Sequence, residues 1–406
     1  MKPMGPIPPG FKADPHGRLL IGGRTAEDLI AEAGGTPLFV YDTSIVASQI
    51  KEFRKSIPAG IALHYAVKAN PYSPLLTWIA DRVDGFDIAS AGELGRVADL
   101  GLPISFAGPA KTDQQLETAL RAGVTINLES EGEAERALAI AAQLSRPSKL
   151  AVRVNPPFAL KGAGMKMGGL ASQFGVDHDR APALIRRLIG SGADWRGLHI
   201  FTGSQTLQAD ALIEAQAATM QLAANISEEA GFSPPEVNLG GGFGIPYFPG
   251  DQSLDVEAVG TALGKILDSR PNILQETKFA IELGRWIVGE AGVYLTRIVD
   301  RKESRGETFL ITDGGLHHML AASGNFGQLL RRNYPVAIAN RFGADPDDVA
   351  TVTGCLCTPL DLLAHEVFLS RAEVGDVVAI FCAGAYGLSA SPQDFLGQPK
   401  AREMLV

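Results

Sequence analysis

The run Ile-Ala-Leu-His-Tyr-Ala-Val-Lys-Ala at residues 61–69 is the first of eight short apolar or β-branched segments that alternate with helical patterns. Strands separated by helices are typical of repeated βα units around a parallel sheet. The other seven segments lie at 83–90, 104–108, 124–128, 150–155, 195–202, 236–240 and 279–284. Eight such segments predict a closed (β/α)8 barrel, in which chemistry gathers at the carboxyl ends of the strands.

The chain on either side of these segments follows other patterns. Thr25, with Asp28 three residues later, resembles a capping box that opens a helix over 26–33, and an apolar run follows at 38–41. After residue 290 strands replace helices, at 292–299, 308–312, 349–353, 366–370 and 376–381. We therefore expect an N-terminal segment (1–45) that joins a β-rich C-terminal domain (291–406), with the barrel between them (46–290).

Composition favours a protein that acts on a small molecule. The 406 residues are 46% hydrophobic, enough for a large core, and a net charge of −9 argues against nucleic acid or an anionic membrane as a partner. The chain has no unbroken apolar run of eighteen residues and begins without a secretory signal pattern, so we expect a cytoplasmic protein. Cys355, Cys357 and Cys382 lack the spacing of a zinc site or a disulfide framework, and we expect reduced thiols and no metal.

Chemically capable side chains fall late in the predicted strands: Lys68 in the first, Asp87 in the second, Arg153 in the fifth, His199 in the sixth and Glu282 in the eighth. Among small and apolar neighbours, the ammonium of Lys68 is expected to lose solvation, which favours the neutral amine that forms Schiff bases. Taken alone, Lys68 fits better a lysine that extends from a strand end into solvent, and it is the two distant segments described next that favour the Schiff base.

A glycine run, Leu-Gly-Gly-Gly-Phe-Gly at 239–244, follows the seventh segment. It could merely turn a strand into a helix, but phosphate sites recur after the seventh and eighth strands of such barrels. Glu282 could pair with Arg285 in solvent, or it could meet a pyridinium nitrogen while Arg285 binds phosphate. Lysine, glycine loop and acid together predict a site for pyridoxal 5′-phosphate, and an acid at the ring nitrogen suits decarboxylation.

Nine ordered motifs resemble the fold-type III pyridoxal phosphate-dependent decarboxylases, the group of diaminopimelate, ornithine and arginine decarboxylases. They are HYAVKAN at 64–70, GFDIASAGEL at 85–94, RVNP at 153–156, GLHIFTGSQ at 197–205, LGGGFG at 239–244, ELGR at 282–285, TDGG at 312–315, CTPLD at 357–361 and GAYGLSAS at 384–391. The resemblance covers nearly the whole chain. It implies a barrel of the alanine-racemase type with a β-rich C-terminal domain, assembled as a homodimer with shared active sites.

The resemblance also assigns site residues by position. Lys68 would carry the cofactor as a Schiff base, and Glu282 would meet its pyridine nitrogen. Cys357, which in the family comes from the opposite subunit, would return a proton after carbon dioxide leaves. The residues that would surround the phosphate or line the site are Asp87, Glu93, Arg153, Phe201, Ser204, Gly240, Gly241, Gly242, Gly284, Arg285 and Tyr386.

The chain departs from the family where the substrate would be recognised. Phe201 replaces a histidine that stacks on the cofactor in most members, and Thr358 replaces an acid that meets the distal ammonium of diamino acids. Ala321 and Asn325 stand where the diaminopimelate enzymes place an arginine and a tyrosine that hold the distal end. We take Thr358, Asp361 and Asn325 as candidate substrate contacts and expect a different substrate tail.

Three interpretations remain open. The first is an amino-acid decarboxylase that is diaminopimelate-like in sequence. The second is a decarboxylase of a carrier-protein-bound or masked aminoacyl group, because the departures resemble an exosortase-associated subgroup and relatives that use carrier proteins. The third is a pyridoxal phosphate-binding regulator without turnover, against which the retention of Lys68, Glu282 and Cys357 argues. The glycine-rich run 162–169 predicts a loop that could close over substrate.

Overall fold

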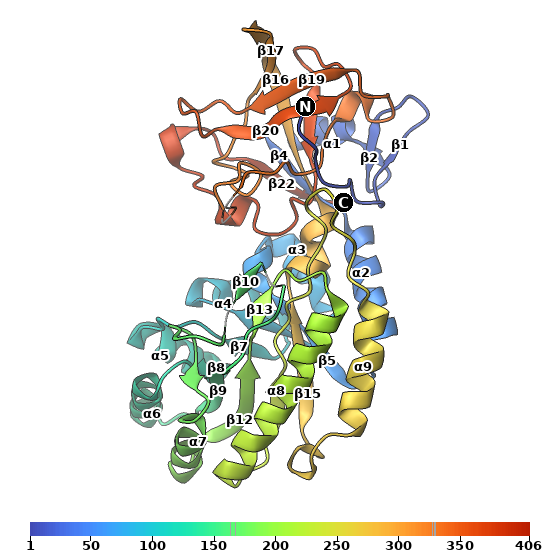
Figure 1. The fold of residues 1–406 in the computed structure, drawn as a ribbon. Coiled ribbons are helices and arrows are strands. Elements are labelled where there is room, and N and C mark those ends of the chain that lie inside the picture. The colour runs from blue at the N-terminus through green and yellow to red at the C-terminus, as the bar shows by residue number, and fades with distance from the viewer. Residues whose placement is uncertain (163, 167, 327, 329) are drawn as a thin grey trace. The chain divides into compact units, whose positions relative to one another are not determined.

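The structure is a computed structural model that describes residues 1–162, 164–166, 168–326, 328 and 330–406 (Figure 1). The chain forms two compact units. Unit 1 comprises Met1–Gln49, Ile245–Gln252 and Arg285–Val406, and unit 2 comprises Ile50–Gly244 and Ser253–Gly284. The domain boundaries expected at residues 45 and 290 stay a prediction.

Unit 2 contains a closed barrel of eight parallel strands. In spatial order they are β9 (Lys149–Asn155), β12 (Asp194–Ile200), β14 (Glu236–Asn238), β15 (Lys278–Leu283), β5 (Ile61–Ala66), β6 (Gly85–Ile88), β7 (Ile104–Phe106) and β8 (Thr125–Leu128). Pairing of β8 with β9 closes the ring, and the short strand β11 (Val176–Asp177) adds to β9 outside it. Every barrel strand overlaps one of the eight predicted segments, so the predicted (β/α)8 barrel is confirmed.

Helices connect the barrel strands, and Figure 1 shows the long helices α8 and α9 running alongside them. The helices are α3 (Ser73–Ala80), α4 (Ala91–Val97), α5 (Asp113–Ala122), α6 (Glu131–Leu144), α7 (Ala181–Gly190), α8 (Ala209–Ala230) and α9 (Val256–Asp268). Side chains at Ser90, Thr112 and Ser130 accept an N–H from the first turn of the helix that follows, which fixes where α4, α5 and α6 begin.

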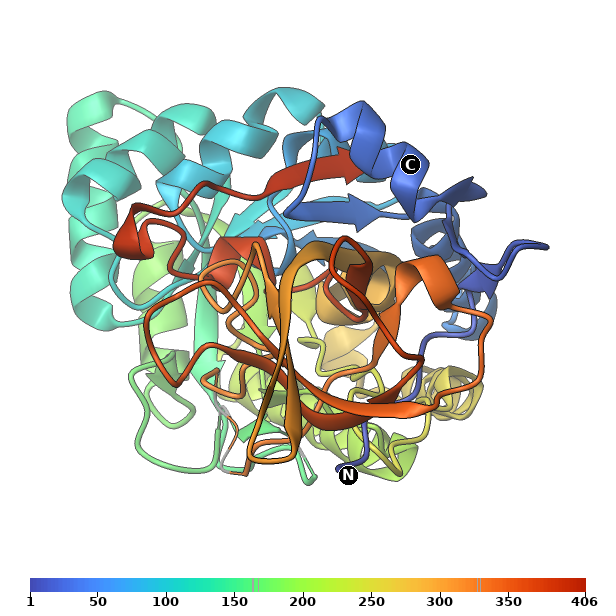
Figure 2. The ribbon, with the colours of Figure 1, turned by 90° about the horizontal axis from the view of Figure 1, so that it is seen from above.

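Unit 1 is built on a mixed sheet that combines both ends of the chain. Its strands are β4 (Leu38–Tyr41), β16 (Gly292–Ser304), β17 (Glu307–Thr312), β18 (Val336–Ile338), β19 (Asp348–Thr353), β20 (Leu362–Leu369), β21 (Val377–Ile380) and β22 (Arg402–Leu405). The five strands expected after residue 290 are present, whereas β18 and β22 were not predicted. Strand β4 pairs with both β16 and β22, and Figure 2 shows β4 and β22 side by side. The N-terminal segment therefore contributes to this sheet.

The N-terminal helix α1 (Ala26–Ala33) has the predicted bounds, and the Thr25 side chain accepts the N–H of Asp28 as its cap. A small sheet of β1 (Lys12–Ala13), β2 (Leu19–Ile21) and β3 (Arg24–Thr25) precedes it. Two further helices, α2 (Thr43–Ser56) and α10 (Arg285–Val288), follow β4 and β15. Apolar side chains of α1, β4, β16 and β21 pack into one core, which includes Leu29, Leu38, Leu295 and Val377.

The glycine-rich run 162–169 contains a short strand, β10 (Met165–Lys166), which pairs with β13 (Gly203–Ser204). Met165 and Lys166 are therefore held by the segment that follows β12. Ala163 and Met167 lie outside the described residues, and closure of this loop over substrate stays a prediction.

Within the described ranges, no helix combines the length and hydropathy needed to cross a membrane. The same residues contain no cluster of three or more His, Cys, Asp or Glu side chains arranged to hold a metal ion. Cys355, Cys357 and Cys382 are all free thiols.

Candidate active site

Lys68 lies in a 3-10 turn, η1 (Val67–Ala69), that directly follows β5. Its Nζ is 3.5 Å from Oδ2 of Asp87 on the neighbouring strand β6, and 5.8 Å from the ring centroid of Phe201. The Lys68 side chain is 41% exposed. The expectation that Lys68 loses its solvation is therefore wrong, because the turn carries the side chain off the apolar strand and places it beside a carboxylate.

Asp87 is a buried acid poised to titrate near neutral pH. Burial raises the pKa of Asp87 to about 7, the negative charge of Glu282 adds to the rise, and Lys68 offsets only part of it. Its Oδ1 finds no hydrogen-bond partner among the residues that the structure describes. A carboxyl group with this pKa, next to an amine, can take up or return a proton at working pH.

Glu282 on β15 is also buried but stays ionised. Burial alone would raise the pKa of Glu282, but the charge and hydrogen bond of His199, together with Lys68 and Arg153, outweigh it and lower the pKa to about 2. Nε2 of His199 lies 3.0 Å from Oε2 of Glu282 and donates to it, because an ionised carboxylate can only accept. Nδ2 of Asn238 donates to the same oxygen at 3.2 Å.

Asn238 ties the glycine run to Glu282. Its Oδ1 accepts the backbone N–H of Gly240 at 2.8 Å, and because that N–H can only donate, the amide NH2 of Asn238 must face Glu282. The carbonyl of Gly240 in turn accepts the N–H of Glu282 at 2.9 Å. The start of the loop and the acid are thus held as one assembly.

The glycine run has space for backbone only. Gly240 and Gly242 have φ of +71° and +93°, and a Cβ added to Gly241 would lie 2.0 Å from the carbonyl oxygen of Glu282. Beside this loop, the buried hydroxyl of Ser204 has no partner among the described residues. A bare backbone loop next to an unsatisfied hydroxyl, with an ionised acid on the adjacent strand, fits the phosphate and ring nitrogen of pyridoxal phosphate.

Gly284 explains how the strand that carries Glu282 approaches the turn that carries Lys68. A Cβ at Gly284 would lie 2.6 Å from Cβ of Ala69 and 3.0 Å from the carbonyl oxygen of Ala66. The end of β15 therefore packs against η1 without an intervening side chain. This close approach brings Glu282 and Lys68 to the same end of the barrel.

Arg153 forms an ion pair and Glu93 accepts a hydrogen bond near the site. Nη1 of Arg153 pairs with Oε1 of Glu129 at 2.7 Å, and Glu129 also accepts the N–H groups of Gly108 and Gly175. Glu93 accepts the N–H of Ala89 at 2.7 Å at the start of α4. The proposed place of both side chains beside the cofactor stays a prediction.

His199 was not predicted as the partner of Glu282, and neither Asn238 nor Glu129 was predicted as a site residue. His199 and Glu282 are 83 positions apart and meet only through the barrel register. The available signal for Asn238 and Glu129 was their position, because each ends or directly follows a barrel strand and precedes a loop.

Unit 1 brings together two predicted phosphate ligands. Nη1 of Arg285, at the start of α10, donates to the Tyr247 hydroxyl at 2.9 Å, and its guanidinium lies 4.7 Å from the ring centroid of Tyr386. Tyr386 has a left-handed backbone conformation, with φ of +53°. The guanidinium is thus fixed between two aromatic rings.

The remaining predicted residues lie on loops of unit 1. Cys357 is exposed. Both carboxylate oxygens of Asp361 accept backbone N–H groups, from Leu316 at 2.6 Å and from Leu356 at 2.8 Å. Asp361 therefore shapes the loop that carries Cys357. Contact of Asp361 with substrate stays a prediction, as it does for the adjacent Thr358.

Asn325 is exposed and donates through Nδ2 to the hydroxyl of Ser323 at 2.8 Å. Ala321, four residues earlier, is buried. The two positions that hold the distal end of substrate in diaminopimelate enzymes therefore offer no charged group here, and the role of Asn325 in substrate binding stays a prediction.

A closed βα barrel with a lysine after one strand, a glycine loop after another and an ionised acid beside both defines a pyridoxal phosphate enzyme. Residues 43–289 match the family model of the pyridoxal-dependent decarboxylase, pyridoxal binding domain. The chain therefore belongs to the pyridoxal-dependent decarboxylases, and it is a pyridoxal phosphate-dependent amino-acid decarboxylase.

Known proteins similar to the chain include two curated relatives and a solved structure. An L-glutamyl-(BtrI acyl-carrier protein) decarboxylase of Niallia circulans is 35% identical, over 91% of this chain and 88% of the relative. A diaminopimelate decarboxylase of Archaeoglobus fulgidus is 31% identical, over 96% and 92%. The structure of diaminopimelate decarboxylase from M. jannaschii with L-lysine superposes with a TM-score of 0.86 at 26% identity, over 98% and 92%.

Replacing His199 tests whether it keeps Glu282 ionised. In His199→Phe the burial of Glu282 is opposed by Lys68, Arg153 and the hydrogen bond of Asn238 but no longer by His199, so the pKa of Glu282 rises. Because protonation of Glu282 removes its charge, the affinity of the apoenzyme for pyridoxal phosphate should fall with decreasing pH below that raised pKa, by up to about tenfold per pH unit relative to wild type. Spectrophotometric titration of apoenzyme between pH 5 and 8 measures this.

His199→Gln is the matched control, because the glutamine amide can still donate a hydrogen bond to Glu282. This variant should keep most of the wild-type dependence of cofactor affinity on pH. Wild type itself should show no step from Glu282 in this range, since its pKa of about 2 lies far below. If cofactor affinity depended on pH in the same way in His199→Phe and in wild type, the role assigned to His199 would be contradicted.

Proposed function

We propose that this decarboxylase acts through Lys68 as the residue that binds the cofactor aldehyde, with Glu282 against the pyridine nitrogen. The observation that carries the proposal is the buried carboxylate of Glu282, which His199 and Asn238 keep ionised. Bound pyridoxal phosphate supplies an electron sink for the α-carbon when the carboxylate leaves. An ionised acid at the ring nitrogen favours the protonated ring, which is the stronger sink.

The other residues of unit 2 have distinct proposed roles. Asp87 holds or releases a proton beside Lys68, because its pKa lies near 7 and its Oδ2 is 3.5 Å from the amine. The backbone of Gly240, Gly241 and Gly242, with the hydroxyl of Ser204, receives the phosphate. Phe201 covers the ring by stacking but donates no hydrogen bond.

Lys68→Ala should abolish the visible absorbance of the lysine-bound cofactor and all release of carbon dioxide. Without the amine no Schiff base to the protein can form. Absorption spectra of purified protein measure the first effect and trapped carbon dioxide the second. Lys161→Ala, which removes an exposed lysine of unit 2 that pairs with Glu214, is the control and should retain both. Persistence of the band in Lys68→Ala would remove Lys68 from this role.

We further propose a homodimer in which Cys357 returns the proton to the active site of the opposite subunit, as the resemblance implies. The exposed thiol of Cys357, on a loop fixed by the backbone bonds of Asp361, supports this. The thiols are free, as a reducing compartment requires, and we propose that the enzyme works in the cytoplasm.

Cys357→Ala should retain cofactor and lose turnover by about 100- to 10,000-fold, the range expected for removal of a proton donor. Cys355→Ala is the neighbouring-thiol control and should stay active. Mixing Lys68→Ala with Cys357→Ala subunits should restore about a quarter of wild-type activity, because half of randomly mixed dimers then hold one intact site of two. Activity assays of the mixture measure this, and absence of any recovery argues against shared sites.

The substrate is proposed to be an amino acid whose far end is not held by charge. Thr358, Ala321 and Asn325 replace the three side chains that hold the distal groups of diaminopimelate in the family. One observation favours the second candidate, a carrier-linked aminoacyl group. The relative from Niallia circulans, 35% identical, is named for a glutamyl group on an acyl-carrier protein.

Release of labelled carbon dioxide separates these candidates. We expect turnover of a carboxyl-labelled aminoacyl group that is masked or tethered at its far end, and at least about tenfold lower kcat/KM for free diaminopimelate, because a distal ammonium without its partner loses at least about 1.4 kcal/mol. The screen compares free amino acids with aminoacyl-pantetheine and aminoacyl-carrier substrates. Preference for free diaminopimelate would reject both candidates.

A further inference from the structure

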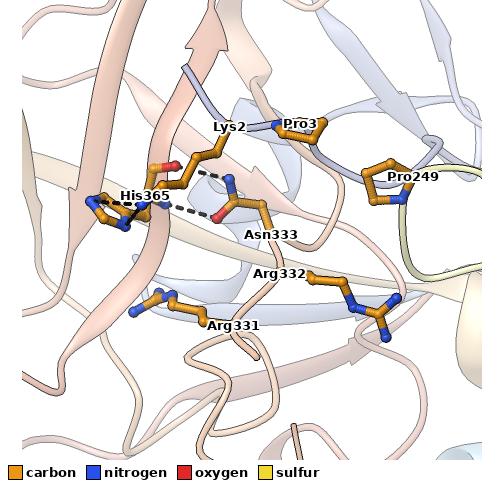
Figure 3. Close-up of a pocket in the computed structure, with 7 residues that line it drawn as sticks. All are labelled: Lys2, Pro3, Pro249, Arg331, Arg332, Asn333 and His365. Atoms are coloured by element: carbon orange, nitrogen blue, oxygen red, sulfur yellow. Dashed lines mark hydrogen bonds between the residues drawn. The ribbon is translucent and has the colours of Figure 1, made fainter. Parts of the chain in front are cut away.

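A basic pocket in unit 1 lies apart from the residues assigned above. It has a volume of about 320 Å³ and is lined by Lys2, Pro3, Pro249, Arg331, Arg332, Asn333 and His365 (Figure 3). Three of these side chains are cationic and none is a carboxylate, although the chain carries a net charge of −9. The local charge is therefore opposite to that of the whole chain.

Backbone hydrogen bonds fix the walls of this basic pocket. The N–H of Lys2 donates to the carbonyl of Glu366 at 2.8 Å, and the N–H of Gly5 donates to the carbonyl of Asn333 at 3.3 Å. The Asn333 side chain accepts the N–H of His365 and donates to its carbonyl, each at 2.9 Å, as the dashed lines in Figure 3 show. The N-terminal residues, strand β20 and the segment before β18 are thus joined.

The positive charge of the pocket is poorly balanced. Nε of Arg331 is buried without a hydrogen-bond partner, and neither Arg331 nor Arg332 forms an ion pair with a carboxylate in the described part of the chain. Nζ of Lys2 lies 2.7 Å from Nδ1 of His365. The nearby acid Glu366 is 3.9 Å from Lys2. Among the described residues, Lys2 is thus the one cation of the pocket that forms an ion pair with a carboxylate.

Electrostatics at His365 point the same way. Burial and then repulsion from Lys2 lower the pKa of His365, and Glu366 compensates only in part. Burial also lowers the pKa of Arg331. An anion in the pocket would relieve both effects, since it supplies the missing negative charge and accepts the unused N–H groups.

Arg332 connects the pocket to a row of packed aromatic rings. Its guanidinium lies 3.6 Å from the ring centroid of Phe248, whose ring is 5.8 Å from Tyr334. Tyr334 lies 4.9 Å from Tyr247, and Tyr247 accepts the hydrogen bond of Arg285. Within unit 1, packed rings thus run from the pocket to the arginine proposed for the cofactor phosphate.

We propose that this pocket is a binding site for a phosphate ester. Guanidinium groups match phosphate oxygens with a rigid fork of donors, and Lys2 adds a compact charge with three N–H groups. Figure 3 shows Arg331 and Arg332 leaving the chain in opposite directions, so Lys2, Arg331 and His365 form one end of the site and Arg332 the other.

Two sources supply this chemistry: a free phosphorylated molecule, or the phosphodiester of the phosphopantetheine arm by which a carrier protein holds its cargo. Assignment to a carrier arm rests on the proposed carrier-linked substrate. The proposal that the pocket binds phosphate does not rest on that substrate.

Calorimetry on the holoenzyme tests whether the basic pocket binds phosphate. In the holoenzyme the bound cofactor already occupies the cofactor phosphate site, so a phosphate probe does not bind there. The probes are inorganic phosphate, phosphopantetheine and pantetheine. We expect both phosphate probes to bind, and Lys2→Gln/Arg332→Gln to weaken them at least about tenfold, the equivalent of one lost charge-assisted hydrogen bond. Arg371→Gln is the control, because it removes an exposed arginine of the same unit that pairs with Glu373, and it should bind as wild type does.

The outcomes separate the proposals. Phosphopantetheine bound more tightly than both pantetheine and inorganic phosphate, with the preference lost in the double variant, supports a carrier arm. Inorganic phosphate bound as tightly as phosphopantetheine supports a free phosphorylated ligand. No binding of either phosphate probe, or equal binding by the double variant, overturns the site. Carbon dioxide release from aminoacyl-pantetheine, which has no phosphate, reports on the decarboxylase function independently.

Discussion

The buried negative charge of Glu282 is the constraint around which unit 2 is arranged. Removing a carboxylate from water costs several kcal/mol, and hydrogen bonds to a charged group return about 1.5–3 kcal/mol each. His199 and Asn238 provide two such bonds to one oxygen, while Lys68 and Arg153 add attraction at longer range. Because Asn238 also holds Gly240, the same network that keeps the acid ionised fixes the start of the glycine loop.

Two buried acids on nearby strands behave differently because their partners differ. Glu282 is hydrogen-bonded to His199, and its pKa falls to about 2. Asp87 has one oxygen without a partner among the described residues, and its pKa rises to about 7. Part of that rise comes from Glu282 itself, so ionisation of one acid promotes protonation of the other. Glu282 thereby carries a fixed negative charge, while Asp87 carries an exchangeable proton beside Lys68.

The sequence predicted the barrel well because each buried parallel strand is a short apolar run between turn signals. It also placed Lys68, Asp87 and Glu282 late in or just after barrel strands, where the structure has them and where the active residues of such barrels gather. The pairing of His199 with Glu282 could not be predicted, because it depends on the register that brings β12, β14 and β15 together. The exposure of Lys68 was missed because the strand pattern continued into a 3-10 turn. Strands β18 (Val-Ala-Ile) and β22 (Arg-Glu-Met-Leu) were not predicted, because β18 is a single short run outside the repeated βα pattern and β22 begins with two charged residues.

The residues proposed for chemistry and those proposed for substrate choice lie in different parts of the chain. Lys68, Asp87 and Glu282 lie on or beside barrel strands of unit 2, whereas Ala321, Asn325 and Thr358 lie on loops of unit 1. Relatives with similar overall identity carry different substrate names, one a carrier-linked glutamyl group and another diaminopimelate. A distal ammonium and carboxylate without charged partners would lose hydration and gain little in return. A neutral amide or thioester tail has no such penalty, so the proposed loss of the charged partners would select against free diaminopimelate and tolerate a masked substrate.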